Sequence, residues 1–254
     1  MSDAATVIEA ITSRIALPGD DAVHVEDSLT GELRSLAAWW RSLAGENPLE
    51  PREVTPPALQ DWTALDAFAA GAQAADAAVD SGATLLIPRT SERDASAARV
   101  LISVLTRAEA QAVVPQSAGT ADGRWMSDRE WMSAVTEVRD RSALLDDLRG
   151  EPIGLLEALP APGIAFISGA LLSAAARRTT CIIDGTDELA AALVADRLST
   201  GAKSWWIAGS QSPDAARQSA TDRMGLREGL PLALTDEDGW GARSTIAMLR
   251  LVVE

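Results

Sequence analysis

The sequence predicts an α/β fold of three layers, in which a mainly parallel sheet is covered by helices on both faces. Short apolar runs, such as 83–88 and 179–184, alternate along the chain with longer segments of helical periodicity. Strands this apolar must be buried on both faces, and alternation of helix and strand favours parallel pairing. At 254 residues the chain is long enough for one such domain with a sizeable core. We therefore expect residues 1–254 to form a single domain.

The N-terminal residues are expected to be helical. Residues 4–17 carry apolar side chains at helical spacing, and the proline at position 18 ends that pattern. A second helix is expected from about 27 to 44, with leucines and a tryptophan along one face. Residues 1–45 are therefore interpreted as an N-terminal helical part.

Residues 46–61 differ in composition from the segment before them. Prolines fall close together here among few large apolar residues, which is typical of a surface linker. Beyond this linker, helical segments and short apolar runs follow one another in regular order. The expected helices are 62–80, 95–105, 125–148, 162–177 and 187–198, with a last helix ending the chain, and the expected strands are 83–88, 111–114, 179–184 and 204–208.

Charge and cysteine content exclude several classes of function. The 22 Lys and Arg residues against 37 Asp and Glu give a net charge of −15, which repels phosphate backbones and anionic lipid. We therefore expect neither nucleic acid nor a membrane as a partner. The sole cysteine, Cys181, excludes an internal disulfide and a cysteine-cluster metal site. With no signal peptide or membrane span recognisable, the expected location is the cytoplasm, and we expect no cofactor and no metal.

Ligands of parallel α/β sheets bind at the carboxyl ends of the strands, so the loops after the predicted strands are the candidate sites. Asp184 and Gly185 follow one strand directly, where an acid beside a permissive glycine can hold a ligand hydroxyl. Alternatively, Asp184 caps the next helix or ties down the turn. Both interpretations remain open.

Two further loops contain candidate residues. In 209–217 a cluster of Ser, Gln and Asp opens a helix, whose free N–H groups can bind an anion, although Ser212 and Asp214 fit simple caps equally well. In 236–241 three carboxylates precede a glycine turn, and clustered carboxylates raise one another's pKa, as a general base requires. A solvated acidic loop would have the same composition.

Read together, these segments resemble the nicotinate-nucleotide:dimethylbenzimidazole phosphoribosyltransferases of cobalamin lower-ligand assembly. The resemblance extends over nearly the whole chain and is closest after residue 162. The residues that match are 28–33, 85–88, 112–114, 123–126, 163–177, 183–185, 190–193, 207–208 and 239–242. The resemblance implies a doubly covered parallel sheet, a small helical part built from both chain ends, and usually a homodimer.

The resemblance also implies a reaction and a site. Members transfer phosphoribose from nicotinate mononucleotide to a benzimidazole nitrogen, with a loop glutamate near the C-terminus as the base. That position falls on Asp238, whose carboxylate is one methylene shorter. The candidate ligand-binding residues are Asp184, Gly185, Ser210, Gln211, Ser212, Gly239, Gly241 and Arg89.

The sequence departs from the family pattern in four places. One glycine- and arginine-rich loop falls on 115–119, which keeps only Gly119. The glycine-rich phosphate loop falls on 89–96, where no glycine remains, and the His-Arg-Ser loop falls on 210–212, which is neutral. The Asp-His-Gly segment has no counterpart, and the linker 46–61 stands in its place. Two hypotheses follow: a transferase of this family, or a non-catalytic descendant that binds a small ligand or a partner.

Arginines in the former phosphate loop allow two interpretations. Arg89 and Arg93 are able to bind a carboxylate or phosphate bidentately. They fit equally as partners of Glu92 and Asp94, which is the commoner fate of a loop with mixed charges.

Overall fold

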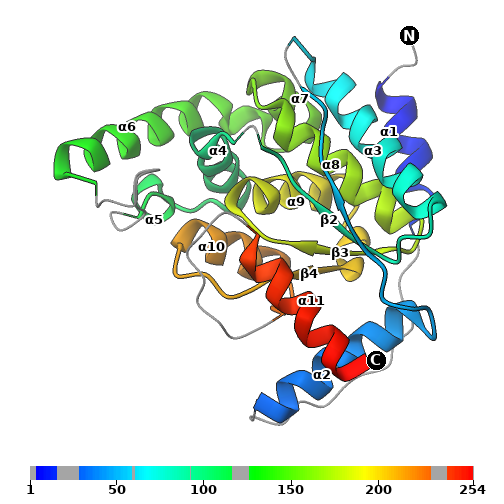
Figure 1. Ribbon diagram of the computed structural model, residues 1–254. Helices are drawn as coiled ribbons and strands as arrows, with labels where there is room; N and C mark the ends of the chain where they lie inside the picture. Colours follow the sequence, from blue (N-terminus) through cyan, green and yellow to red (C-terminus); the bar gives the residue numbers. More distant parts are fainter. Residues whose placement is uncertain are drawn as a thin grey trace.

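The protein is a parallel sheet between two layers of helices (Figure 1). The computed structural model describes residues 4–15, 29–58, 61–91, 93–115, 126–229 and 239–253. Its sheet has the strand order β1-β2-β3-β4, and every neighbouring pair is parallel. The strands are β1 (Pro51–Val54), β2 (Leu85–Pro88), β3 (Thr180–Ile183) and β4 (Trp206–Ala208). This confirms the predicted fold class.

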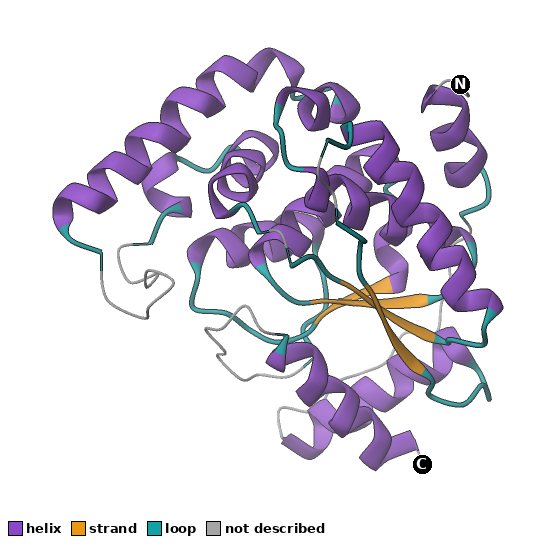
Figure 2. Ribbon diagram, turned by 45° about the horizontal axis from the view of Figure 1, so that its top comes forward, coloured by secondary structure: helices purple, strands orange, loops and turns teal. Residues whose placement is uncertain are grey.

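Alternation of side chains along the strands explains why both faces are covered. Leu86 and Cys181 belong to one hydrophobic cluster, whereas Leu85 and Ile182 belong to another. The first cluster lies under α3 (Ala64–Asp80), α8 (Pro162–Ala176) and α9 (Thr186–Leu198). The second lies under α2 (Leu29–Ala44) and α11 (Trp240–Val253), which pack side by side on the opposite face (Figure 2).

The remaining helices surround this frame. They are α1 (Ala4–Thr12), α4 (Ala95–Thr106), α5 (Ala110–Val113), α6 (Asp128–Leu145), α7 (Pro152–Ala158) and α10 (Ala215–Met224), with 3-10 turns η1 (Asp146–Leu148) and η2 (Ala202–Trp205). A capping box between Ser127 and Glu130 starts α6, and Thr63 caps α3 by accepting from the Asp66 N–H. Polar side chains at these starts satisfy N–H groups that have no partner within the helix.

Backbone contact between α3 and α8 forms the centre of the larger helical layer. A Cβ atom added to Gly71 would lie 1.9 Å from the carbonyl oxygen of Phe166. A Cβ atom added to Gly169 would lie 2.0 Å from the carbonyl oxygen of Phe68. Each glycine therefore admits the backbone of the other helix at a distance that any side chain would prevent.

The predicted strand at 111–114 is wrong. Residues Ala110–Val113 form the helical turn α5, which packs against α4, α6 and α10. Because β2 pairs directly with β3, the sheet has no position for a strand between them. An apolar run this short is compatible with either structure, and the good helix formers Ala and Gln favour the turn.

The interpretation of 46–61 as a linker is corrected at its centre. Residues 51–54 form β1, and Pro51 to Val54 pair with Leu85 to Pro88 of β2. A proline is tolerated here because β1 is an edge strand. The polar composition of residues 51–54 gives no local signal of a strand, and only their pairing with β2 identifies one.

Two properties concern the chain as a whole. Among the described residues no helix is both long and apolar enough to cross a membrane. Cys181 is a buried free thiol in β3, and burial raises the pKa of that thiol far above its ordinary value. The residue therefore packs as a core side chain.

Asp196 on α9 allows a pH-dependent prediction. Its side chain is 13% exposed and lies 4.0 Å from the Lys203 ammonium. Burial raises the pKa of Asp196, although Lys203, Arg223 and Arg197 lower it in part. A raised carboxyl pKa means that the folded state binds the proton more tightly than the unfolded chain. Asp196 therefore supports stability below the ordinary Asp pKa of about 3.9, and this support is lost as pH rises through the folded value.

We expect Asp196→Asn to have a higher free energy of unfolding than the wild type at pH 7, with the difference shrinking toward pH 3. Asparagine keeps the shape of the side chain without the charge that burial disfavours. Urea denaturation of both proteins at the two pH values measures the effect. A difference that is the same at both values would contradict the assignment.

Candidate functional site

Asp184 joins three elements at the carboxyl end of β3. Its Oδ1 accepts a hydrogen bond from Arg217 Nη2 at 2.8 Å, and its Oδ2 accepts from the backbone N–H of Ala242 at 2.9 Å. The Asp184 and Arg217 side chains are each only 3% exposed. Asp184 thus ties α10 and the first turn of α11 to the end of the strand. This structural role differs from the expected alternative of a helix cap, because α9 has Gly185 at its N-cap position and no side-chain cap.

The loop after β4 touches the start of α11 through its backbone. A Cβ atom on Gly241 would lie 2.6 Å from Ser210 Oγ and 2.7 Å from Asp184 Oδ1. A Cβ atom on Gly209 would lie 2.8 Å from the Ala242 nitrogen. Both positions therefore require glycine. Ser210 is buried, and its Oγ has no hydrogen-bond partner in the described part of the chain.

The rest of that loop serves as a helix cap. Asp214 accepts from the Ala216 N–H at 2.8 Å and starts α10, while Ser212 Oγ accepts from the Asp214 N–H at 3.2 Å. The capping alternative therefore holds for Asp214, while Ser212 supports the residue that forms the cap. Gln211 is exposed beside them.

Arg99 holds this cap in place, although the sequence analysis did not identify it. Two of its nitrogens contact the Asp214 carboxylate, at 3.2 and 2.7 Å, and Nη1 also donates to the Val113 carbonyl. The available signal was a single charge within the apolar segment 97–105 of α4. Arg217 was missed in the same way, as a charge that follows two alanines and becomes buried on α10.

A second group of charges lies over the carboxyl ends of β1 and β2. Arg89 follows β2, and its Nη1 is 3.7 Å from Glu53 Oε1. The same oxygen is 3.9 Å from Nη2 of Arg243, whose guanidinium lies 5.5 Å from the ring centroid of Trp240. Gly239 has φ 78°, and a Cβ atom there would lie 2.7 Å from Arg89 Nη1. The Arg89 guanidinium thus occupies the space that a side chain at position 239 would need.

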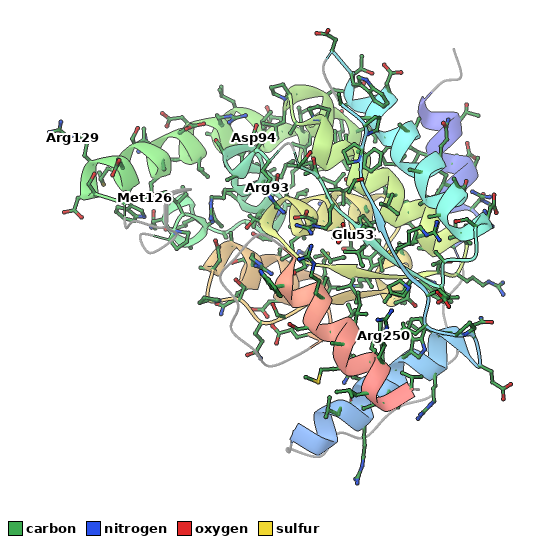
Figure 3. All side chains as sticks on the ribbon, in the orientation of Figure 1. Glu53, Arg93, Asp94, Met126, Arg129 and Arg250 are labelled. Atoms are coloured by element: carbon green, nitrogen blue, oxygen red, sulfur yellow. The ribbon has the colours of Figure 1, made fainter. Side chains whose placement is uncertain are left out.

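Arg93 and Asp94 are anchored to the first turn of α9. Arg93 Nη1 donates to Glu188 Oε2 at 3.2 Å, and the Asp94 N–H donates to Asp187 Oδ2 at 2.9 Å (Figure 3). Asp94 also caps α4 by accepting from the Ala97 N–H. The expected ion pairing of Arg93 is thus found, but with Glu188 on another helix. Glu92 lies outside the described residues.

The structure brings together five of the nine candidates from the sequence. Asp184, Ser210 and Gly241 meet at the ends of β3 and β4, and Arg89 meets Gly239 beside them. The other described candidates are close in sequence: Gly185 precedes α9 with φ 138°, Ser212 supports the cap of α10, and Gln211 is exposed beside it. Asp238, the candidate base, lies outside the described residues.

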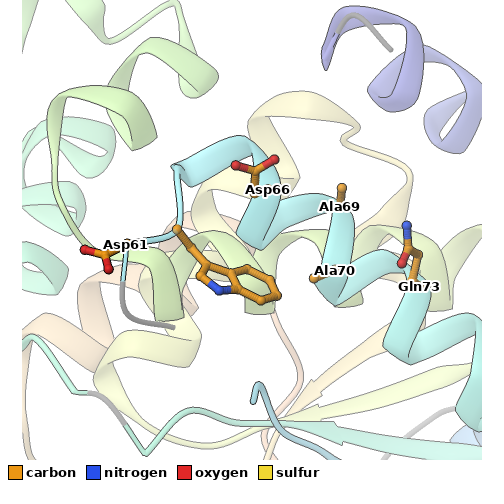
Figure 4. Close-up of a pocket in the computed structure, with 6 residues that line it drawn as sticks. Asp61, Asp66, Ala69, Ala70 and Gln73 are labelled. Carbon is orange, nitrogen blue, oxygen red and sulfur yellow. The ribbon is translucent and has the colours of Figure 1, made fainter. Parts of the chain in front are cut away.

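A hollow of about 460 Å³ lies at the start of α3 (Figure 4). It is lined by Asp61, Trp62, Asp66, Ala69, Ala70 and Gln73. None of these is a candidate from the sequence. Asp66 is already engaged, because its carboxylate accepts from Thr63 Oγ1 at 2.7 Å.

A doubly covered parallel sheet with polar residues converging at its carboxyl ends places the chain in the class of α/β proteins whose ligands bind at the strand ends. The sequence profile of the phosphoribosyltransferase family matches residues 52–254. The chain belongs to that family, which confirms the resemblance found in its sequence.

Curated relatives and a solved structure agree with this assignment. A nicotinate-nucleotide–dimethylbenzimidazole phosphoribosyltransferase of Corynebacterium efficiens is 34% identical over 191 residues, covering 75% of this chain and 50% of the relative. That of Mycobacterium ulcerans is 37% identical over 202 residues, covering 79% and 54%. The crystal structure of the enzyme of that name from Thermus thermophilus has a TM-score of 0.63 at 25% identity, covering 75% of this chain and 54% of that one. The chain thus spans about half the length of these relatives.

Proposed function

We propose that the protein is a phosphoribosyltransferase that uses nicotinate mononucleotide and dimethylbenzimidazole, in assembly of the lower ligand of cobalamin. The observation that carries this proposal is the meeting of Asp184, Ser210 and Gly241 at the ends of two parallel strands, next to Arg89 and Gly239. Ligands of this fold class bind at that edge of the sheet. The names of relatives that are 34% and 37% identical supply the substrates.

In this proposal Asp238 is the general base. It removes the ring proton of the benzimidazole while the other ring nitrogen attacks C1′ of the ribose, and nicotinate leaves with the electrons of the broken bond. Its neighbour Gly239 contacts Arg89, and Ala242 is held by Asp184. These contacts anchor the start of α11 directly after the base.

A second candidate function is ligand or partner binding without turnover. It is favoured by the anchoring of the end of loop 89–94 to α9, through Arg93 to Glu188 and through the Asp94 N–H to Asp187. Backbone N–H groups of a glycine-rich loop can cradle a phosphate, but this loop has no glycine, and the Arg93 side chain and the Asp94 N–H are held against α9. Under this hypothesis the protein binds the nucleotide or the base, or a protein partner, and releases no nicotinate.

Turnover by wild type and Asp238→Asn distinguishes the two candidates. The protein is incubated with nicotinate mononucleotide and dimethylbenzimidazole, and chromatography measures the nicotinate released. For a transferase we expect Asp238→Asn to lower the rate by about 100-fold or more, because it removes the base. The affinity for dimethylbenzimidazole, measured by calorimetry, should change little.

Asp236→Asn is the matched control, because it removes an equal charge from the same acidic segment. Asp236→Asn should retain most of the wild-type rate of nicotinate release. Calorimetric binding without nicotinate release by the wild type would favour the second candidate. Neither binding nor release would contradict both.

We further propose that the protein is a cytoplasmic homodimer. The proposal is supported by the homodimer that the family resemblance implies and by apolar side chains outside the second hydrophobic cluster. Trp39 on α2 is only partly buried, and Leu251 on α11 is 76% exposed. Sedimentation at tens of micromolar tests it, since a monomer at that concentration would contradict it.

A further inference from the structure

A hollow of about 430 Å³ lies where the end of α4, the turn into α5, the second half of α6 and η1 meet. Its volume lies within the range of small-molecule sites. Residues 89–94 precede the opposite end of α4, and the 12 residues of that helix span about 18 Å. The hollow shares no residue with the site at the strand ends.

The lining of this hollow has a charge opposite to that of the protein. Three arginines, Arg107, Arg139 and Arg149, face two acids, Glu109 and Asp146, which leaves one positive charge. The chain as a whole carries a net charge of −15. An anion is therefore repelled by most of the surface, whereas at this hollow the arginines offset the acids, including Asp140 beside Arg139.

Arginines near a helix end often serve only to bind its free carbonyl groups. Here that role is largely filled by other groups. The Ser103 carbonyl accepts from the Arg107 backbone N–H at 2.9 Å, and the Val104 carbonyl accepts from Arg149 Nε at 2.9 Å. The Ala108 carbonyl accepts from Ser103 Oγ at 2.8 Å. Arg149 thus has a structural role. These three carbonyl groups already have donors and do not need the Arg107 guanidinium.

The guanidinium groups of Arg107 and Arg139 are available to a ligand. Arg107 is exposed and makes no ion pair within the described part of the chain. Its backbone has φ 65° after the end of α4, a conformation that glycine adopts at less cost. Arg139 pairs with its neighbour Asp140 at 2.8 Å, but the two side chains are 65% and 61% exposed. Such exposed pairs contribute little and are readily exchanged for another anion.

Apolar side chains form much of the remaining lining, among them Val104, Ala108 and Ala143. We propose that this hollow binds a small organic anion, namely a carboxylate or phosphate monoester attached to an aromatic or aliphatic group. Arg107 and Arg139 hold the charged end by paired N–H donors, and the apolar part lies against the alanines and Val104.

Calorimetric titration with phenyl phosphate and with benzoate at low ionic strength tests the proposal. We expect saturable binding of at least one probe, weakened by added salt. The double variant Arg107→Ala with Arg139→Ala should bind about tenfold more weakly or worse, because two charge-assisted contacts are lost. Amide chemical shifts should move in segments 104–111 and 139–149.

The control variant is Arg129→Ala. Arg129 is also an exposed arginine of α6, but it lies at the other end of that helix, outside the hollow (Figure 3). It should change the affinity by less than about twofold, because a distant exposed charge is screened by solvent and salt. Thermal unfolding of all variants checks that the fold is retained.

Several results would overturn the proposal. They are the absence of saturable binding for both probes, equal binding of neutral phenol, equal weakening by Arg129→Ala, and shifts confined to the strand ends around Asp184. Inorganic phosphate that binds as tightly as phenyl phosphate would contradict the role of the apolar lining. None of these results bears on the transferase assay, so the two proposals fail independently.

Discussion

Gly169→Ala is expected to lower the free energy of unfolding by about 3 kcal/mol, near the upper end of the usual range for overpacking. The added Cβ atom would lie 2.0 Å from the Phe68 carbonyl oxygen and 2.8 Å from its carbonyl carbon. Both are backbone atoms of α3, so no side-chain rotation relieves the contact. The helices must separate, and α3 and α8 together cover one face of the sheet.

Gly154→Ala is the matched control in α7. The nearest atoms to a Cβ there lie at 3.5 Å, which is ordinary contact, and alanine favours a helix by up to about 1 kcal/mol over glycine. Urea denaturation should therefore show a stabilised or unchanged Gly154→Ala and a strongly destabilised Gly169→Ala. Equal midpoints for Gly169→Ala and wild type would show that α3 and α8 are not in backbone contact.

Asp184→Ala is expected to lower the free energy of unfolding by about 3 to 5 kcal/mol. The substitution leaves the Arg217 guanidinium buried without its carboxylate, and Nε and Nη1 of Arg217 already have no partner within the described residues. It also removes the acceptor of the Ala242 N–H. Because this contact anchors the start of α11, ligand binding at the strand ends should weaken as well.

Asp140→Ala is the control for a comparable pair in a different environment. The Asp140–Arg139 and Asp184–Arg217 pairs both have N···O distances of 2.8 Å, but the first is exposed and the second is buried. Denaturation should show a loss below about 1 kcal/mol for Asp140→Ala. Adding Arg217→Met to Asp184→Leu should recover part of the lost stability, since it removes the unpaired buried charge. Similar losses for Asp184→Ala and Asp140→Ala would contradict the assignment.

Local patterns predicted the elements with strong periodicity. The strand around Ile182 and the helices on either side of it were expected within a few residues of where they lie. The errors fall on weak patterns: 111–114 is a single helical turn, and the polar segment 51–54 is an edge strand. The partner strand of 51–54 is distant in sequence, so no local pattern contains it, whereas an apolar run as short as 111–114 is compatible with a strand or a helical turn.

Part of the candidate site was predictable from local patterns in the sequence, and part was not. Asp184 could be found because strand ends are where ligands bind in this fold class, and the glycines of the α11 turn because the family resemblance covers residues 239–242. Arg99 and Arg217 could not be found, because a single arginine in a helical segment has the same local pattern whether it is solvated or buried. Their roles depend on Asp214 and Asp184, which lie 115 and 33 residues away along the chain.

By itself the sequence determined the fold class, the order of the main elements and the family, because apolar periodicity and motif order are properties of the chain alone. Only the tertiary structure decided that Gly71 and Gly169 bring two helices into backbone contact, and that Asp184 uses both carboxylate oxygens within the protein. It also brought Arg107 and Arg139 to one hollow. These features depend on distances between segments far apart in sequence, which packing of the whole chain sets.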